Sequence, residues 1–199
     1  MPTDAMMNPD PRFPGALLSP TASIFGDVAI GVGSSVWLNA VVRCETQKVR
    51  IGRLTNLQDF AMIHVGYDHP TTIGDFCSIT HHATVHGAHV GDACLIGIGA
   101  VLMDGVVLGA GSIVAGGAVA TEGSVFEPGS IVAGIPAKVI RRRDATRDNR
   151  MNAWLYHRNA CAYSRGEHRA WDGAEFERWK AQLLAELASD ADLLRLERL

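Results

Sequence analysis

The sequence predicts an all-β solenoid, a parallel β-helix of hexapeptide repeats, followed by C-terminal α-helices. An aliphatic residue recurs at every sixth position, first from Ile24 and again, without interruption, from Val90 to Val114. Glycine and other small residues fill the positions between, which is typical of the corners of stacked coils. From Asn149 glycine becomes scarce and the apolar residues take a helical spacing.

Composition restricts the classes of partner. The chain has 199 residues, of which 47% are hydrophobic, and this suits one main domain with an appendage. A formal net charge of -3 gives no general electrostatic basis for binding nucleic acid or an anionic membrane, so neither partner is expected. The first 15 residues contain four prolines and no apolar run, so they predict neither a signal peptide nor a transmembrane span. We therefore expect a cytoplasmic protein.

The cysteines predict no thiolate chemistry. No C-x-x-C pair occurs among them, which argues against a cysteine zinc site or a disulfide framework. We expect buried free thiols at Cys44, Cys77, Cys94 and Cys161.

The repeat runs through Ile24, Ile30, Val36 and Val42 and then slips twice. Nine residues rather than six separate Val42 from Ile51, and residues 66–72 make a second break of phase. Both breaks predict loops. Residues 131–136 are expected to leave the solenoid just before the basic run at 141–143, because proline limits the backbone there. This gives two predicted domains: a β-helix over 1–144 that carries the functional site, and a helical extension over 145–199 that packs on it.

Two helices are expected in the extension. One carries Trp154, Leu155, Arg158 and Ala162 on a single face, and residues 174–199 form a longer amphipathic helix. The apolar side of the second helix consists of Phe176, Trp179, Leu183, Leu184 and Leu187. We interpret the aromatic residues as packing anchors rather than a cofactor site.

Two histidines occupy equivalent positions in neighbouring coils. In a three-faced coil the same face recurs at every third hexad, so Ile63 and Val85 lie on one face, one coil apart. Each is followed by a histidine, His64 and His86. Stacked strands lie about 4.8 Å apart and a zinc-to-histidine bond is about 2.1 Å, so these two imidazoles can reach one metal ion.

A third histidine is out of phase with this pair. His81 follows the aliphatic residue Ile79 by two places rather than one, so it points elsewhere within its own chain. Its expected partner is another subunit. The remaining histidines are interpreted as ordinary exposed or hydrogen-bonded residues, namely His69, His82, His89, His157 and His168.

Specific motifs accompany the histidines. Arg43 stands before a short loop, and an N-x-Q-D motif follows at Asn56, Gln58 and Asp59. His64 comes next, then H-x(4)-H from His81 to His86, and later the segment IVAGIPAKVI. On these residues the segment from Ile24 to about Arg143 resembles the γ-class carbonic anhydrases and their bacterial hexapeptide-repeat relatives. The resemblance implies a left-handed β-helix assembled as a homotrimer, with a metal at each interface. It implies His64 and His86 as ligands from one chain and His81 from its neighbour.

The implied activity is that of a zinc-dependent lyase, which hydrates carbon dioxide reversibly to bicarbonate by metal-bound hydroxide. Three histidines leave a fourth position open on zinc, as in catalytic sites. Zinc lowers the pKa of bound water from 15.7 to about 7, which makes hydroxide available at neutral pH. Imidazole also suits iron and cobalt, so either is an alternative metal.

The resemblance also implies catalytic candidates. The amide of Gln58 is expected to orient the hydroxide or a substrate oxygen, and Asn56 to orient Gln58. Asp59 accepts a proton or fixes a positive neighbour, and its family counterpart is paired near an arginine like Arg43 across the interface. An Arg-Asp pair of this kind can equally serve only to hold the trimer together. Glu45 stands where the family usually has aspartate, and the loop 66–70 is shorter than the acidic segment of the archaeal members.

Two other functions remain open from the sequence. A hexapeptide-repeat acyl- or acetyltransferase, or another enzyme acting on CoA thioesters, uses one histidine as a base at a subunit interface and binds coenzyme A along the coils. Three clustered histidines exceed that requirement, and metal content separates the two enzymes. A noncatalytic trimeric scaffold that keeps a metal for stability is the second alternative.

Overall fold

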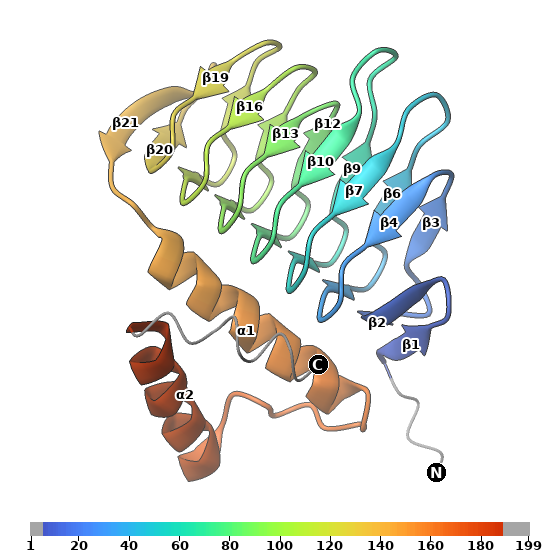
Figure 1. Cartoon of the computed structure of the whole chain (residues 1–199), viewed down its shortest axis with the longest axis vertical. Helices are drawn as coiled ribbons and strands as arrows, with labels where there is room; N and C mark the ends of the chain where they lie inside the picture. The colour runs from blue at the N-terminus through green and yellow to red at the C-terminus, as the bar shows by residue number, and fades with distance from the viewer. Residues whose placement is uncertain (1–5, 189–199) are drawn as a thin grey trace.

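Three sheets of mainly parallel strands wind around one core to form a solenoid (Figure 1). The computed structural model describes residues 6–188. One sheet has nine strands and the other two have six each. The predicted all-β solenoid with C-terminal helices is confirmed.

The strands of each sheet come from successive coils. The helix-side sheet contains β1 (Asn8–Asp10), β2 (Phe13–Leu18), β5 (Ser35–Val36), β8 (Asn56–Leu57), β11 (Ser78–Ile79), β14 (Leu95–Ile96), β17 (Ile113–Val114), β20 (Ser130–Ala133) and β21 (Lys138–Arg142). The histidine sheet contains β3 (Ser23–Phe25), β6 (Val41–Arg43), β9 (Met62–His64), β12 (Thr84–His86), β15 (Val101–Leu102) and β18 (Val119–Ala120). The third sheet contains β4 (Val28–Ile30), β7 (Val49–Ile51), β10 (Thr71–Ile73), β13 (His89–Val90), β16 (Val107–Leu108) and β19 (Val125–Phe126).

The repeated aliphatic residues fill the interior. On the histidine sheet Val42 lies opposite Ile63, Ile63 opposite Val85, and Val85 opposite Leu102. All four side chains are fully buried. Burial of such apolar surface stabilises the stack by about 25 cal/mol per Å². The two breaks of phase are loops, as predicted, because they connect β6 to β7 and β9 to β10.

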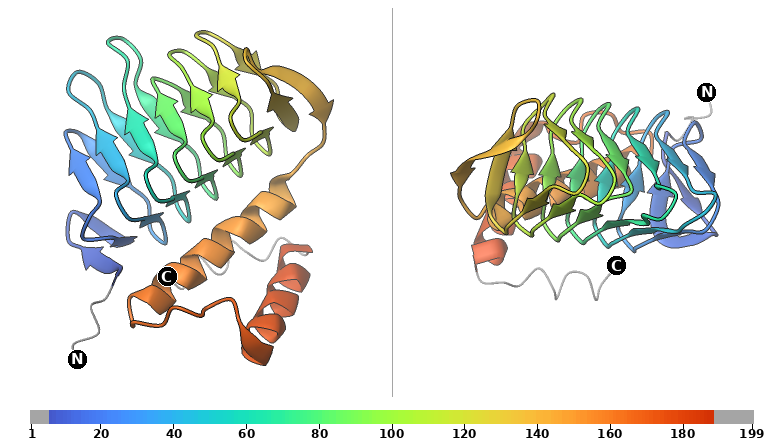
Figure 2. Two further views of the ribbon diagram at one scale, coloured as in Figure 1. Left: turned by 180° about the vertical axis from the view of Figure 1, so that it is seen from behind. Right: turned by 90° about the horizontal axis from the view of Figure 1, so that it is seen from above.

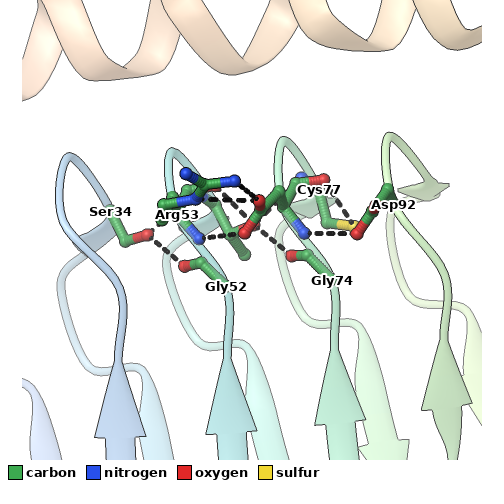
Figure 3. Close-up of polar contacts among 8 residues, drawn as sticks. Ser34, Gly52, Arg53, Gly74, Cys77 and Asp92 are labelled. Carbon is green, nitrogen blue, oxygen red and sulfur yellow. Dashed lines mark hydrogen bonds and ion pairs between the residues drawn. The ribbon is translucent and has the colours of Figure 1, made fainter. Parts of the chain in front are cut away.

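Small polar side chains tie neighbouring coils together at one corner. The hydroxyl of Thr55 donates a hydrogen bond to the carbonyl oxygen of Gly74 (2.8 Å) and accepts one from the backbone N–H of Cys77 (3.0 Å). The thiol of Cys77 then donates to the carbonyl of Gly91 at 3.1 Å, and its burial raises the pKa of that thiol. Figure 3 labels part of this corner at Ser34, Gly52, Arg53, Gly74, Cys77 and Asp92.

The cysteines are free within the described chain, and three of them are buried: Cys44, Cys77 and Cys94. Cys161 is only partly buried. The expectation of buried thiols is therefore confirmed for the three that lie in the coils.

Helix α1 (Thr146–Tyr163) lies along the helix-side sheet, and α2 (Gly173–Ala188) packs against α1 (Figures 1 and 2). Trp154 is 4% exposed and joins Phe76 and Leu183 in one apolar cluster. The buried amide of Asn149 donates to the carbonyl of Ala93 at 2.7 Å. Helix α1 contacts strands β5, β8 and β11, whereas the predicted stretch 189–199 of the second helix lies outside the described residues.

Both ends of the solenoid differ from the prediction. The first coil begins earlier than Ile24, because Leu18 already lies opposite Val36. Ile131 does not leave the solenoid, because it lies opposite Ile113 in the helix-side sheet. Antiparallel strands, β1 at one end and β21 at the other, extend this sheet beyond the coils. Each covers a strand edge that a parallel repeat alone would leave open. No helix within residues 6–188 is long and apolar enough to cross a membrane.

Candidate metal centre

Strands β9 and β12 bring two of the predicted ligands together. His64 lies directly opposite His86 in the parallel register. Nδ1 of His64 is 3.0 Å from Nε2 of His86, and the ring centroids are 4.9 Å apart. The equivalence of position that the repeat predicts therefore places two imidazoles side by side.

Carboxylates occupy the outer nitrogens of this pair. Nε2 of His64 lies 2.9 Å from Oε2 of Glu45, and Nδ1 of His86 lies 2.6 Å from Oδ1 of Asp104. The guanidinium of Arg43 in turn bonds Glu45. These five residues form a continuous row, which we name the histidine-pair half-site.

Electrostatics favour a neutral imidazole at His64. Burial lowers the pKa of His64, and the nearby Arg43 cation and His86 lower it further, while Asp104 acts in the opposite direction. A histidine must be neutral to bind a metal. Burial, Arg43 and His86 therefore favour the neutral form of His64 that a metal ligand requires.

His81 lies in the turn between β11 and β12. Its Nδ1 is 3.0 Å from Oδ2 of Asp59. A turn at His81 and His82, in which His82 has a φ of 58°, precedes β12 and sets His81 apart from the strand that carries His86. Within residues 6–188 no group of three or more histidine, cysteine, aspartate or glutamate side chains is placed to hold a metal ion.

Two buried amides precede Asp59, the carboxylate beside His81, in the N-x-Q-D motif. Gln58 is 2% exposed, and its Nε2 donates to Oδ1 of Asn56 at 3.0 Å, which is the contact expected between these residues. Asn56 donates to the hydroxyl of Ser78 at 2.9 Å, and Asn152 of α1 donates to the same hydroxyl at 2.8 Å. We name Asn56, Gln58, Asp59 and His81 the single-histidine half-site. Its polar network is anchored to helix α1.

Asp104 was not among the site residues predicted from the sequence. The residue stands two places after Leu102, which lies opposite Val85, so the repeat places it just beyond the corner that follows His86. The position of Asp104 in the repeat can be counted from the sequence. The contact of its side chain with His86 cannot be predicted in this way. The expected pairing of Asp59 with Arg43 across an interface stays a prediction, because within one chain Arg43 bonds Glu45 and Asp59 bonds His81.

Other histidines have neighbours of their own. The ring of His82 stacks on Phe60 with centroids 4.9 Å apart. His89 contacts Thr72, and Nδ1 of His157 donates to the carbonyl of Gly33 at 2.9 Å.

The chain is similar in sequence to proteins of a known family. Residues 87–121 match the family described as bacterial transferase hexapeptide (six repeats). Gamma carbonic anhydrase 3, a mitochondrial protein of Arabidopsis thaliana, is 42% identical over 174 residues, which cover 82% of this chain and 67% of that protein. The chain belongs to the γ-class carbonic anhydrase family. Gamma carbonic anhydrase 1 of the same plant is 41% identical over 133 residues, covering 64% of this chain and 48% of that protein. The match thus spans about half the length of that relative.

A solved structure also resembles this γ-class chain. A hexapeptide transferase family protein from Anaplasma phagocytophilum superposes with a TM-score of 0.67 at 34% identity. The superposition covers 76% of this chain and 89% of that one.

The γ-class relatives imply a metal cofactor, and the donor set of this chain fits one. Two histidine nitrogens bound to one tetrahedral zinc at about 2.1 Å lie roughly 3.4 Å apart, close to the 3.0 Å between His64 and His86. A metal-ligating histidine typically donates its other N–H to a carboxylate. Glu45, Asp104 and Asp59 stand in that position at His64, His86 and His81.

Proposed function

We propose that this chain is a γ-class carbonic anhydrase that catalyses the reversible hydration of carbon dioxide to bicarbonate. Its metal site is shared between copies of the chain in a homotrimer: His64 and His86 come from one copy and His81 from the next. One observation carries the proposal. Each of the three histidines contacts a carboxylate, as a metal ligand would, yet His81 lies apart from the other two within one chain. Each chain therefore supplies two incomplete half-sites.

Zinc is the proposed metal, with iron and cobalt as alternatives because imidazole binds all three. When bound, such a metal supplies a nucleophilic water by lowering its pKa to about 7. The protein's own side chains bind the metal and orient the substrate. Neutral imidazoles of His64, His86 and the neighbouring copy's His81 would hold the metal.

The neighbouring side chains then have defined tasks. Glu45, held by Arg43, fixes the ring of His64 through its outer nitrogen. Gln58 orients a substrate oxygen with its amide, and Asn56 holds that amide in place. Asp59 either fixes His81 or accepts the proton that hydration releases. Burial of both amides makes their geometry rigid before substrate binds.

The division into a β-helical domain over 1–144 and a helical extension over 145–199 is part of the proposal, as is a cytoplasmic location. The names of the plant relatives place those proteins in mitochondria. No nucleic-acid or membrane partner is proposed.

Metal content and hydration rate, measured on the same preparation, test the proposed function. We expect about one zinc ion per chain, and stopped-flow hydration of carbon dioxide that a chelator abolishes and added zinc restores. A trimer that holds its metal but shows no hydration would favour the scaffold and contradict the enzyme.

The transferase alternative is favoured by the description of the matching family, bacterial transferase hexapeptide (six repeats), and by the likeness to the hexapeptide transferase family protein. Acyl transfer from a CoA thioester by metal-free protein, without carbon dioxide hydration by the zinc-loaded protein, would establish it. The paired histidines argue for the metal enzyme, because a transferase base requires one imidazole and no ligand partner.

A further inference from the structure

We propose that Asp104 is a positioning residue of the metal site. Its carboxylate holds His86 in the tautomer that carries the proton on Nδ1, so that Nε2 presents its lone pair toward His64. This inference rests on the proposed function, since it takes His86 to be a metal ligand. It adds a residue that the motifs shared with the family did not indicate.

The geometry of His86 sets the location of its proton. Nδ1 lies 2.6 Å from Oδ1 of Asp104, and Nε2 faces Nδ1 of His64 at 3.0 Å. A neutral imidazole carries one N–H, and an ionised carboxylate only accepts hydrogen bonds. The proton of neutral His86 therefore belongs on Nδ1, where it donates to Asp104.

The fold makes room for this carboxylate. The φ angle of Gly87 is 57°, a left-handed conformation that favours glycine, and a Cβ on this residue would overlap Oδ1 of Asp104. A Cβ on Gly66, one coil earlier, would lie 2.6 Å from the same oxygen. Two successive coils therefore carry glycine where a side chain would push Asp104 away from His86.

The backbone also fixes Asp104 in place. The N–H of Gly105 donates to the carbonyl of Gly87 at 2.8 Å, and the N–H of Gly123 donates to the carbonyl of Asp104 at 2.8 Å. The carboxylate is therefore carried by a corner that is bonded to the coil on either side. A support of this kind is more rigid than the flexible side chains of an ordinary surface ion pair.

Glu122 provides a matched comparison. Leu102 lies opposite Ala120, so Asp104 and Glu122 occupy the same position in consecutive coils. Glu122 is exposed, and no histidine stands beside it at the position equivalent to His86. Replacing Glu122 removes the same charge at the same place in the repeat without touching the half-site.

The tautomer can be measured without metal or activity. Nitrogen-15 NMR of the histidine side chains in the metal-free trimer, at a pH where imidazoles are neutral, distinguishes Nδ1–H from Nε2–H. We expect His86 to be Nδ1–H in the wild type and in Glu122→Gln, and Asp104→Ala to shift it toward Nε2–H. An unchanged tautomer in Asp104→Ala would overturn the inference.

Zinc affinity, measured by competition with a chromophoric chelator, gives the second readout. We expect Asp104→Ala to weaken zinc binding by about 10- to 100-fold, and Asp104→Asn, which keeps an acceptor oxygen, to weaken it less. Glu122→Gln should bind zinc as the wild type does. The asparagine variant keeps the shape of the side chain, so it carries the test if the alanine variant folds poorly.

The outcomes separate the two proposals. A wild-type trimer that binds no zinc would contradict the proposed function and this inference with it. A wild type that binds zinc, combined with wild-type affinity in Asp104→Asn and in every folded Asp104 variant, would contradict only the role of Asp104.

Discussion

The two ends of strand β12 carry different halves of the proposed site. At its carboxyl end His86 faces His64 on the neighbouring coil at 3.0 Å, and carboxylates hold both outer nitrogens. At the corner before its amino end the imidazole of His81 contacts Asp59, next to a buried amide network that is anchored to helix α1. One end thus holds two potential ligands and the other holds one.

The difference follows from the geometry of stacked strands. Equivalent positions in adjacent coils are separated by about 4.8 Å, whereas residues along one strand move apart by about 3.3 Å each. In a solenoid, side chains at equivalent positions of adjacent coils therefore lie close together, whereas side chains several residues apart along the chain do not. His81 lies in the turn between β11 and β12, so the proposed site takes His81 and His86 from different chains.

The largest effect is expected from removing the single histidine. His81→Ala should abolish zinc binding at every site of the trimer, because each site takes this ligand from a neighbour. His82→Ala is the matched control, since this adjacent residue stacks on Phe60. Zinc content after dialysis provides the measurement. Full zinc occupancy in His81→Ala would show that the histidine-pair half-site binds metal without the other end.

A smaller effect is expected from the amide network. Gln58→Ala should retain zinc but hydrate carbon dioxide roughly a hundredfold more slowly, because one preorganised hydrogen bond in a reacting site commonly contributes about 3 kcal/mol. Gln182→Ala, which removes an exposed glutamine from α2, is the control. Stopped-flow rates per bound zinc give the comparison. If Gln58 only fills space, the variant will lose thermal stability while its rate per zinc stays near that of the wild type.

The smallest effect concerns pH and the docking of helix α1. Burial lowers the pKa of His157, although its hydrogen bond to the Gly33 carbonyl acts the other way. The unfolded chain therefore binds a proton more readily than the folded one, so stability is lost as pH falls below the ordinary histidine pKa of about 6.5. We expect a decrease in Tm of no more than about 4 °C between pH 7 and pH 5.5 from this residue.

The variant His157→Gln isolates this contribution. Its Tm should fall less steeply with acid than that of the wild type, as measured by calorimetry of the metal-free protein. Since α1 contacts Ser78, which also bonds Asn56, loosening of the helix should disturb the single-histidine half-site before the histidine pair. Equal slopes of Tm against pH in the two proteins would exclude His157 as the sensitive group.

Sequence reasoning captured the features that depend on the period of the repeat. The opposition of Ile63 and Val85, and hence of His64 and His86, follows from counting hexads, because inward aliphatic residues fix the register. The offset of His81 by one position was equally countable. These features required no knowledge of side-chain conformation.

The remaining features depend on loops and corners, where the repeat gives no information. The contact of Glu45 with His64 requires a particular path of the chain between β6 and β7. The reach of Asp104 to His86 requires the absence of a Cβ at Gly66 and Gly87. The ends of the solenoid were misplaced because β1 and β21 continue the sheet with strands outside the hexad pattern.

Complementation between defective chains tests the shared site most directly. Metal-free His81→Ala chains mixed with metal-free His64→Ala chains should exchange into mixed trimers, in which some interfaces combine an intact histidine-pair half-site with an intact His81. Zinc added to the mixture should then bind and restore hydration, although neither variant binds zinc alone. No zinc binding, despite mixed trimers demonstrated by native mass spectrometry, would contradict the claim that each metal joins two chains.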